Sequence, residues 1–284
     1  MFHNTIPIQA KGSETEAKLV TYFLDHSSEM LIDKRPVVLI CPGGGYEYTS
    51  EREGEVLATQ FLAMGYHAAV LYYSCAPARF PVALTELANA VKLLRSRADE
   101  WFIDPNAVIV LGSSAGGHLA ACMGILWEED FLAEAVGIRE KDRGILRPDG
   151  MILCYPVITS GEYAHRGSFE CLLGKEEGSL ERWYDKNSLL AQLSLESRVT
   201  SKTSPAFIWH TFTDGRVPVE NSLMMVNALH KAGVPTEFHM YPVGGHGLSL
   251  ANRLTQHRDG SALQEECTSW IPLVHTWLES QFVK

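Results

Sequence analysis

Short hydrophobic runs of strand length alternate along this chain with longer segments in which apolar residues recur at helical spacing. The runs predicted as strands are 18–25, 36–43, 67–74, 107–112, 150–157, 205–212 and 236–243. Residues 36–43 are almost uniformly apolar, which is typical of a strand covered on both faces of a sheet. Residues 18–25 instead alternate between apolar and polar, so we expect them at an edge of the sheet.

Segments of helical period follow most of these runs. Residues 51–65 are predicted as a helix, with Ser50 and Glu53 as an S-x-x-E capping box at its start and Gly65 at its end. Further helices are expected after residue 112 and at 81–101, 218–231 and 265–282. The alternation of strands and helices predicts an α/β fold, in which helices flank a mainly parallel sheet.

This alternation is interrupted at residues 158–204. The stretch has no clear strand pattern and carries scattered glycine, serine and charged residues. A loop of that length without secondary structure is unusual in a compact domain, so we interpret it as a partly helical insertion, or lid, over one end of the sheet. The length of 284 residues and the 46% of hydrophobic residues fit a single domain that spans residues 1–284.

Charge and cysteine content narrow the range of functions. The formal net charge of −10 argues against nucleic acid or an anionic membrane as the main partner. The first residues lack the basic and apolar regions of a signal peptide, and no apolar run approaches the length of a membrane span. The six cysteines form no CxxC pair, so we expect free thiols and a cytoplasmic protein. The sequence leaves the formation of a homo-oligomer open.

A nucleophile motif follows the strand predicted at 107–112. The next residues complete the pattern G-x-S-x-G, with Ser114 at its centre and Ser113 before it. When a strand turns directly into a helix, the central residue projects from a strained turn in which only small neighbours fit. We therefore interpret Ser114 as a nucleophile, and expect the Ala115 N–H and the helix dipole to face the developing negative charge. The alternative is a Gly-Ser-rich turn in which either serine caps the helix.

Two further strand ends supply a base and an acid for this serine. His246 lies in a glycine-rich loop after the last predicted strand, and Asp214 follows the strand before it. A nucleophilic serine needs a base, and the base needs an orienting acid, so we predict a triad of Ser114, His246 and Asp214. Their order along the chain is that of the α/β-hydrolases. His257 remains as an alternative base, and Asp214 taken alone is more typical of a turn or cap residue.

The stretch PGGGYEYTS after the strand at 36–43 is a candidate for binding an oxyanion. Three consecutive glycines let backbone N–H groups approach a ligand closely. A need for flexibility does not explain the three glycines, because Pro42 restricts the chain before them and the predicted capping box restricts it after them. We predict an oxyanion hole formed by the N–H groups of Gly44, Gly45 and Ala115. No H-E-x-x-H motif or similar ligand cluster is present, so no metal and no cofactor are expected.

Assembled in this way, the chain resembles the bacterial acetylesterases and acetyl-xylan-esterase-like proteins of the α/β-hydrolase esterase/lipase superfamily. The segments that carry the resemblance are PGGGYEYTSEREGE, FLAMGYHAAVLYYS, GSSAGGHLA, CYPVITSGEYAHRGSF, WHTFTDGRVPVENSL and GGHGLSLA. The resemblance implies Ser114 as nucleophile, Asp214 as acid and His246 as base. It also implies oxyanion donors at the glycine turn and at Ala115.

The chain departs from related esterases at three positions. Pro42 stands where they carry histidine, Ser113 stands where many carry phenylalanine or histidine, and Thr213 replaces the first residue of an Asp-Asp pair. None of these changes removes a catalytic group. Asp214 is then the only carboxylate left in its turn, which sharpens its assignment.

The resemblance implies a substrate with a short acyl group, often acetyl on sugars or xylan fragments. The residues expected at the substrate pocket are Tyr46, Glu47, Ser113, Tyr163, His165 and Phe169, although each also fits ordinary packing or surface. For a cytoplasmic enzyme, imported acetylated oligosaccharides are better substrates than polymeric xylan. Two alternatives stay open, namely an amide hydrolase of the kynurenine formamidase type and a hydrolase fold that only binds a ligand.

Overall fold

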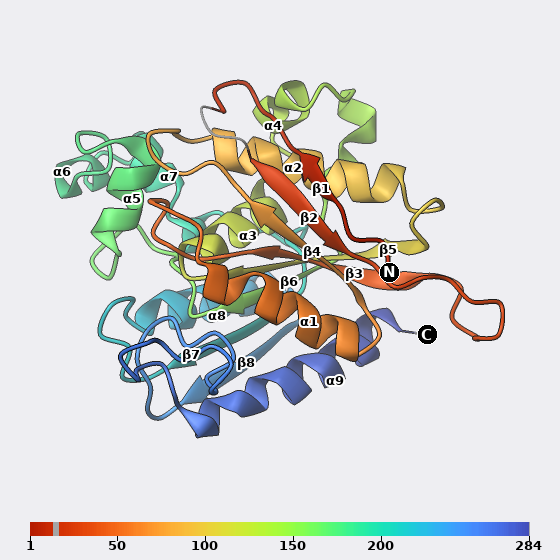
Figure 1. Ribbon diagram of the computed structural model, residues 1–284. Helices are drawn as coiled ribbons and strands as arrows, with labels where there is room; N and C mark the ends of the chain where they lie inside the picture. Colours follow the sequence, from red (N-terminus) through yellow and green to blue (C-terminus); the bar gives the residue numbers. More distant parts are fainter. Residues whose placement is uncertain (14–16, 284) are drawn as a thin grey trace.

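One eight-stranded sheet runs through the molecule, which the computed structural model describes for residues 1–13 and 17–283 (Figure 1). The strand order is β1-β2-β4-β3-β5-β6-β7-β8. The two pairings that involve β2 are antiparallel, and the other five are parallel. The strands are β1 Thr5–Pro7, β2 Lys18–Tyr22, β3 Arg35–Cys41, β4 His67–Tyr72, β5 Ile103–Ser113, β6 Gly150–Cys154, β7 Ala206–Thr211 and β8 Thr236–Tyr241.

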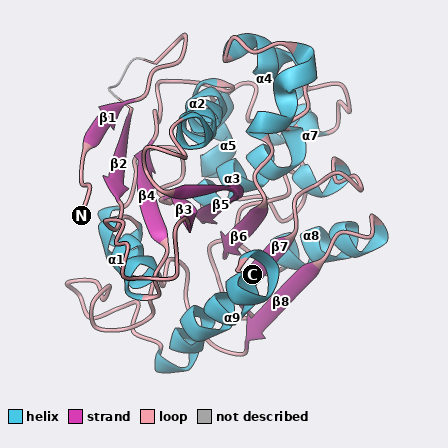
Figure 2. Ribbon diagram, turned by 90° about the vertical axis from the view of Figure 1, so that its right-hand side faces the viewer, coloured by secondary structure: helices cyan, strands magenta, loops and turns pink. Residues whose placement is uncertain are grey.

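Helices cover both faces of this sheet (Figure 2). The longer ones are α1 Glu55–Ala63, α2 Val82–Ser96, α3 Ala115–Leu126, α8 Glu220–Lys231 and α9 Trp270–Phe282. The shorter ones are α4 Asp130–Ala135, α5 Arg166–Leu173, α6 Leu180–Trp183 and α7 Leu189–Gln192, with the 3-10 turns η1 Glu51–Glu53, η2 Glu140–Leu146, η3 Leu195–Ser197 and η4 Glu265–Ser269. Within the described residues, none of the helices combines the length and apolarity that crossing a bilayer requires.

Two hydrophobic cores form because the strand side chains point alternately to opposite faces. In β3, Val37 and Leu39 pack into the core beneath α2, α3 and α8, whereas Val38 and Ile40 pack into the core beneath α1 and α9. All seven residues of β3 are buried, which explains why this run shows no polar alternation. Full burial of one such side chain contributes roughly 1.5–3 kcal/mol. The α/β fold predicted from the sequence pattern, a mainly parallel sheet flanked by helices, is confirmed.

The first part of the chain differs from expectation in two ways. Residues 18–22 do form a strand, but β2 is not at the edge, because β1 pairs with its outer side. The predicted capping box is also wrong: Ser50 makes no side-chain cap hydrogen bond, and a 3-10 turn precedes the helix, which begins only at Glu55. The side chain of Glu53 is buried instead. A three-residue strand carries too little periodicity to be detected from sequence.

The segment between β6 and β7 contains helices α5, α6 and α7 and the turn η3, in agreement with a partly helical insertion. Its buried residues belong to the same core as α2 and α3, among them Phe169, Leu172, Leu190, Leu193 and Leu195. The N–H of Phe80, just before α2, donates to the Leu172 carbonyl over 2.9 Å. The insertion is therefore packed against the sheet-covering helices rather than held apart from them.

The turn from β5 into α3 is sterically crowded. A Cβ on Gly112 would lie 2.0 Å from the Gly116 carbonyl oxygen, and a Cβ on Gly116 would lie 2.1 Å from the Cys41 carbonyl oxygen of β3. Cys41 and Gly112 are paired in the parallel register of β3 and β5. The close approach of these backbones therefore requires glycine at both positions.

The six cysteines of the chain are all free thiols.

Gly116→Ala is expected to destabilise the protein, because the added methyl group would overlap a backbone oxygen that pairing within the sheet holds in place. Overpacking of this kind costs about 1–3 kcal/mol. We expect a lower urea midpoint with an unchanged slope. Gly144→Ala is the matched control, since its Cβ would meet no atom of the described residues within 4 Å. Equal midpoints for the two variants would contradict the steric interpretation of the turn.

Candidate active site

Three chemically reactive side chains meet at the carboxyl edge of the sheet. Ser114 directly follows β5, Asp214 lies in the loop after β7, and His246 lies in the loop after β8. The carboxyl ends of parallel strands share one edge, so loops far apart in sequence converge there. The Ser114 Oγ lies 2.7 Å from His246 Nε2, and His246 Nδ1 lies 2.7 Å from Asp214 Oδ2. The structure thus brings together all three residues of the predicted triad.

The hydrogen-bond partners assign the proton positions in this chain of residues. The Asp214 carboxylate can only accept, so His246 Nδ1–H donates to it. His246 Nε2 is then left to accept the hydroxyl proton of Ser114. Ser114 has φ +56° and ψ −119°, a strained conformation for a non-glycine residue. The strain projects the hydroxyl out of the turn, toward the histidine.

Asp214 is held as an anion by several donors. Its Oδ1 accepts the backbone N–H groups of Arg216 and Val217 over 2.9 and 3.0 Å. Its Oδ2 accepts from His246 and, over 3.2 Å, from His210 Nε2. Burial of the side chain opposes ionisation, but the hydrogen bonds from His210 and His246 outweigh it and hold the pKa of Asp214 well below its usual value.

His210 is a site residue that reasoning from the sequence missed. It lies in β7, is fully buried and donates from Nε2 to Asp214 and to the Val217 carbonyl, 3.0 Å away. Its Nδ1 accepts from the Ser222 hydroxyl over 2.8 Å. The ring therefore ties the acid loop to both β7 and α8. The available signal was a histidine inside an otherwise apolar strand, four residues before the acid.

The glycine turn lies beside Ser114 with free backbone donors. Gly44 has φ +130° and Gly45 has φ +69°, and a Cβ on Gly44 would lie 2.0 Å from the Tyr48 carbonyl oxygen. Among the described residues, no acceptor is found for the N–H of Gly44 or Gly45. Ala115 is the first residue of α3, where backbone N–H groups lack intrahelical partners. None of these three N–H groups has a hydrogen-bond acceptor among the described residues.

Tyr46 and Ser113 do not border the cavity, contrary to expectation. Tyr46 is only 3% exposed, and its hydroxyl donates to His118 Nδ1 over 2.9 Å. His118 Nε2 in turn donates to the Leu193 carbonyl of the insertion over 3.1 Å. Ser113 is the last residue of β5 and is completely buried. Both side chains therefore pack beneath the site, and Tyr46 links the glycine turn to α3 and to the insertion.

A cavity of about 750 Å³ opens over Ser114. Its lining combines polar and apolar groups, among them Gly44, Gly45, Glu47, Tyr48, Arg52, Glu53, Ser114, His165, Arg216, His246, Leu248, His257 and residues 261–264. Glu47 and His165 lie where the sequence reasoning expected them, whereas Phe169 is buried in the core and Tyr163 is outside the lining. The sequence did not predict three further parts of this lining, because only the folded chain brings their loops together. They are Arg52, Arg216 and the loop at 261–264.

His257, the alternative base, is hydrogen-bonded to Arg52 and not to Ser114. Its Nε2 accepts from the Arg52 guanidinium over 2.9 Å, on the side of the cavity formed by the last long loop. The histidine that contacts Ser114 is His246. His246 also packs edge-on against the Tyr155 ring, with centroids 5.3 Å apart. The aromatic contact and the Asp214 hydrogen bond together fix the orientation of the imidazole.

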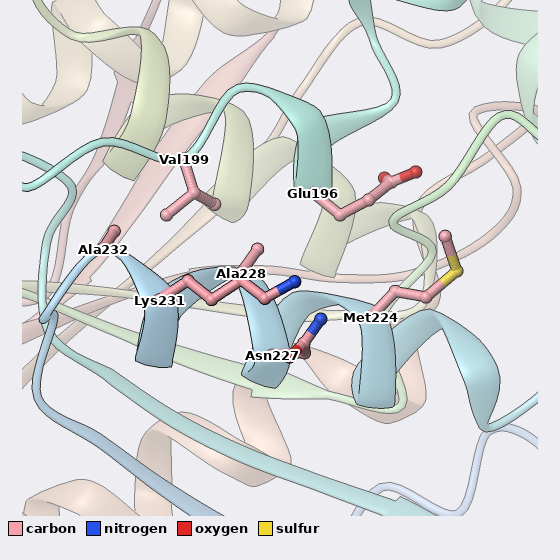
Figure 3. Close-up of a pocket in the computed structure, with 7 residues that line it drawn as sticks. All are labelled: Glu196, Val199, Met224, Asn227, Ala228, Lys231 and Ala232. Carbon is pink, nitrogen blue, oxygen red and sulfur yellow. The ribbon is translucent and has the colours of Figure 1, made fainter.

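A second cavity of about 410 Å³ lies between η3 and α8 (Figure 3). Its lining consists of Glu196, Val199, Met224, Asn227, Ala228, Lys231 and Ala232. This set includes no serine, cysteine or histidine, and it shares no residue with the lining of the first cavity. In the part of the chain that is described, no three His, Cys, Asp or Glu side chains are grouped so that they could hold a metal ion.

The fold and this arrangement at the carboxyl edge define an α/β-hydrolase. A family model named BD-FAE matches residues 26–229, which is more than half of the chain. The chain therefore belongs to the BD-FAE family. This assignment confirms the resemblance to the esterases of the superfamily.

Solved structures of similar proteins cover the whole chain. The acetyl ester-xyloside bifunctional hydrolase from Caldicellulosiruptor lactoaceticus is 34% identical with a TM-score of 0.80, over 99% of this chain and 97% of that one. The carboxylesterase Cest-2923 from Lactobacillus plantarum WCFS1 is 28% identical with a TM-score of 0.82, over 100% and 98%. One of these proteins is named as a hydrolase and the other as an esterase, the class expected from the sequence.

Two curated relatives are much longer than this chain. Endo-1,4-beta-xylanase B of Butyrivibrio fibrisolvens is 36% identical over 225 residues, which are 77% of this chain and 33% of that protein. Acetylxylan esterase of Xylanibacter ruminicola is 28% identical over 234 residues, or 81% of this chain and 44% of that protein. The chain thus spans less than half the length of these two relatives.

The buried imidazole of His118 predicts a pH dependence of stability. Burial lowers the pKa of His118 from 6.5 to about 4, although its hydrogen bond to Leu193 opposes the shift. Unfolding therefore takes up a proton between these pH values, and stability falls as the pH drops from about 6.5 toward 4. In His118→Gln, the loss of unfolding free energy between pH 7 and pH 4.5 should be smaller by about 2 kcal/mol. Urea titrations at several pH values measure this, and parallel curves for the two proteins would contradict it.

Proposed function

We propose that the protein is a serine carboxylesterase that hydrolyses short-chain acyl esters, above all acetyl esters. The observation that carries the proposal is the unbroken hydrogen-bonded chain from Ser114 through His246 to Asp214, which opens into the larger cavity. A nucleophile, a base and an orienting acid in hydrogen-bond contact are what acyl transfer requires. The esterase names of the relatives support the same reaction class.

The geometry supports a two-stage reaction. His246 Nε2 takes the Ser114 proton as the Oγ attacks the ester carbonyl, and the Asp214 anion stabilises the imidazolium that forms. The tetrahedral intermediate collapses when His246 returns the proton to the leaving alcohol. A water molecule, activated by the same histidine, then attacks the acyl-enzyme and releases the carboxylic acid and free Ser114.

The developing oxyanion is bound, in this proposal, by the backbone N–H groups of Gly44, Gly45 and Ala115. The first two lack acceptors among the described residues, and the third lies at the N-terminus of α3, whose dipole favours negative charge. Loss of one such donor typically costs roughly 3–4 kcal/mol of transition-state stabilisation.

For the natural substrate we propose acetylated sugars or oligosaccharides taken up into the cytoplasm. Two relatives, an acetylxylan esterase and an acetyl ester-xyloside hydrolase, support this class of substrate by their names. The cavity also carries the groups that hydroxyl-rich ligands use, namely the Glu47 carboxylate, the Tyr48 hydroxyl and the Arg216 guanidinium. A purely apolar lining would instead suit a long acyl chain.

Ser114→Ala is expected to abolish esterase activity, because Ser114 carries the one hydroxyl or thiol group among the described residues that is hydrogen-bonded to His246. We expect kcat/KM on 4-nitrophenyl acetate to fall by roughly 10⁴-fold or more, with the thermal midpoint nearly unchanged. Wild-type protein should also be labelled stoichiometrically by a fluorophosphonate probe, and the variant should not. Equal labelling of both proteins would place the nucleophile elsewhere.

The preference for short acyl groups is tested by an ester series. Activity should be highest on 4-nitrophenyl acetate and should fall steeply by the octanoate, with acetylated xylo-oligosaccharides deacetylated in parallel. Equal or higher activity on the octanoate would contradict a small acyl site. N-formylkynurenine serves as the amide comparison, and a larger kcat/KM on this compound than on acetylated sugars would favour the amide hydrolase.

A further inference from the structure

Glu53 has a carboxylate buried beside the candidate site, and the reaction proposed above gives it no role. Its side chain is 3% exposed, and no capping bond uses it. Burial of a charge is costly unless hydrogen bonds compensate for it. Both of its oxygens are in fact satisfied: Oε2 accepts the Gly43 N–H over 2.8 Å, and Oε1 accepts the Tyr155 hydroxyl over 2.6 Å. The carboxylate therefore joins the glycine turn to the end of β6.

The hydrogen bond between Glu53 and Gly43 lies close to the proposed nucleophile, Ser114. A Cβ on Gly43 would lie 2.6 Å from Glu53 Oε2 and 3.1 Å from Ser114 Cβ, so the glycine backbone is enclosed between the carboxylate and the serine. The N–H of Gly43 is thereby used up, while the two that follow, at Gly44 and Gly45, remain available. A fixed Gly43 peptide therefore restricts the directions in which the N–H groups of Gly44 and Gly45 can point.

The contact with Tyr155 extends the same network to the histidine. The Tyr155 hydroxyl, which donates to Glu53, also accepts the N–H of Ser249 over 2.9 Å. The Tyr155 ring packs against the imidazole of His246. One buried carboxylate is therefore connected to the glycine turn on one side and to the histidine loop on the other.

The neighbouring residue strengthens this connection. Arg52 donates to the carbonyls of Gly247 and Thr255 over 3.1 and 2.7 Å, and its own carbonyl accepts from the Ser249 hydroxyl over 2.7 Å. The 3-10 turn η1 thus holds the loop that carries His246, while Glu53 on the same turn holds the glycines. Two consecutive residues, Arg52 and Glu53, thus contact both loops.

We propose that Glu53 is a positioning residue that holds the Gly43–Gly45 turn in the orientation needed to bind the oxyanion, with Tyr155 coupling this turn to the loop of His246. The inference rests on the proposed esterase function. Three consecutive glycines have wide conformational freedom, and an unrestrained turn would have to be ordered during each reaction. An oxyanion site is effective because its donors are already oriented before charge develops.

Glu53 acts through Gly43 and does not itself react. Both of its oxygens have hydrogen-bond partners within the protein, and the peptide of Gly43 lies between it and Ser114. Its replacement should therefore weaken transition-state binding and leave the ground-state complex almost intact. This separates a positioning role from a purely structural one, which would lower stability without a specific loss of oxyanion binding.

The test compares Glu53→Ala, Glu53→Gln and Tyr155→Phe with Glu51→Gln, an exposed carboxylate of the same 3-10 turn. For Glu53→Ala we expect kcat on 4-nitrophenyl acetate to fall at least tenfold, with KM changed less than threefold. The inhibition constant of a trifluoromethyl ketone, which binds as a tetrahedral oxyanion, should rise by the same factor as kcat/KM falls. Glu53→Gln retains one acceptor oxygen and should recover part of the lost kcat/KM. Tyr155→Phe should lower kcat/KM less than Glu53→Ala does. Glu51→Gln should have the kcat/KM of the wild type.

Two results would overturn the inference. One is a folded Glu53→Ala protein with kcat/KM within threefold of the wild type. The other is a loss of kcat/KM without a matching loss of trifluoromethyl ketone affinity. If Glu53→Ala does not fold, Glu53→Gln and Tyr155→Phe decide by the same two criteria. If instead wild-type protein and Ser114→Ala hydrolyse the ester at the same rate, the proposed function is wrong and the inference fails with it.

Discussion

The close approach of two backbones, at the end of β5 and the end of β3, is the constraint on which the candidate site depends. Glycine at positions 112 and 116 removes the side chains that would otherwise collide with the Gly116 and Cys41 carbonyls. The chain can then turn at once from strand to helix, and Ser114 is held at φ +56° with its hydroxyl in hydrogen-bond contact with His246. The position of the nucleophile is thus a consequence of backbone packing within the sheet.

Buried polar groups hold the flexible loops around that serine. His210 and two backbone N–H groups hold the Asp214 carboxylate, and Glu53 holds the glycine turn. His118 anchors the residue that follows these glycines and extends the network to the insertion. Such groups contribute little net stability when paired but are costly to leave unpaired, so each one strongly favours a single loop conformation. Glycine-rich loops that would be mobile alone are therefore ordered where chemistry needs them.

Several sequence interpretations were wrong for one common reason. Ser50 and Glu53 have the spacing of a capping box, and Tyr46 follows the glycines like a pocket residue. In the folded chain, the Glu53 and Tyr46 side chains find partners more than 70 residues away, at Tyr155 and His118. A local sequence pattern indicates only those hydrogen-bond partners that lie a few residues away in the chain. When a long-range partner is buried and well oriented, it replaces the local one, and pattern analysis has no access to it.

The sequence by itself determined the fold class, the succession of most strands and helices, and the three residues that converge at the carboxyl edge. These follow from periodicity and from the rule that parallel strands share their carboxyl ends, so the G-x-S-x-G motif, the strand-end positions and the chain order together indicated Ser114, Asp214 and His246. The tertiary structure alone decided the short edge strand β1, the burial of Tyr46, the shape of the cavity and the roles of His210 and Glu53. Each of these depends on contacts between residues far apart in the chain, and such contacts exist only once the core has brought the loops together.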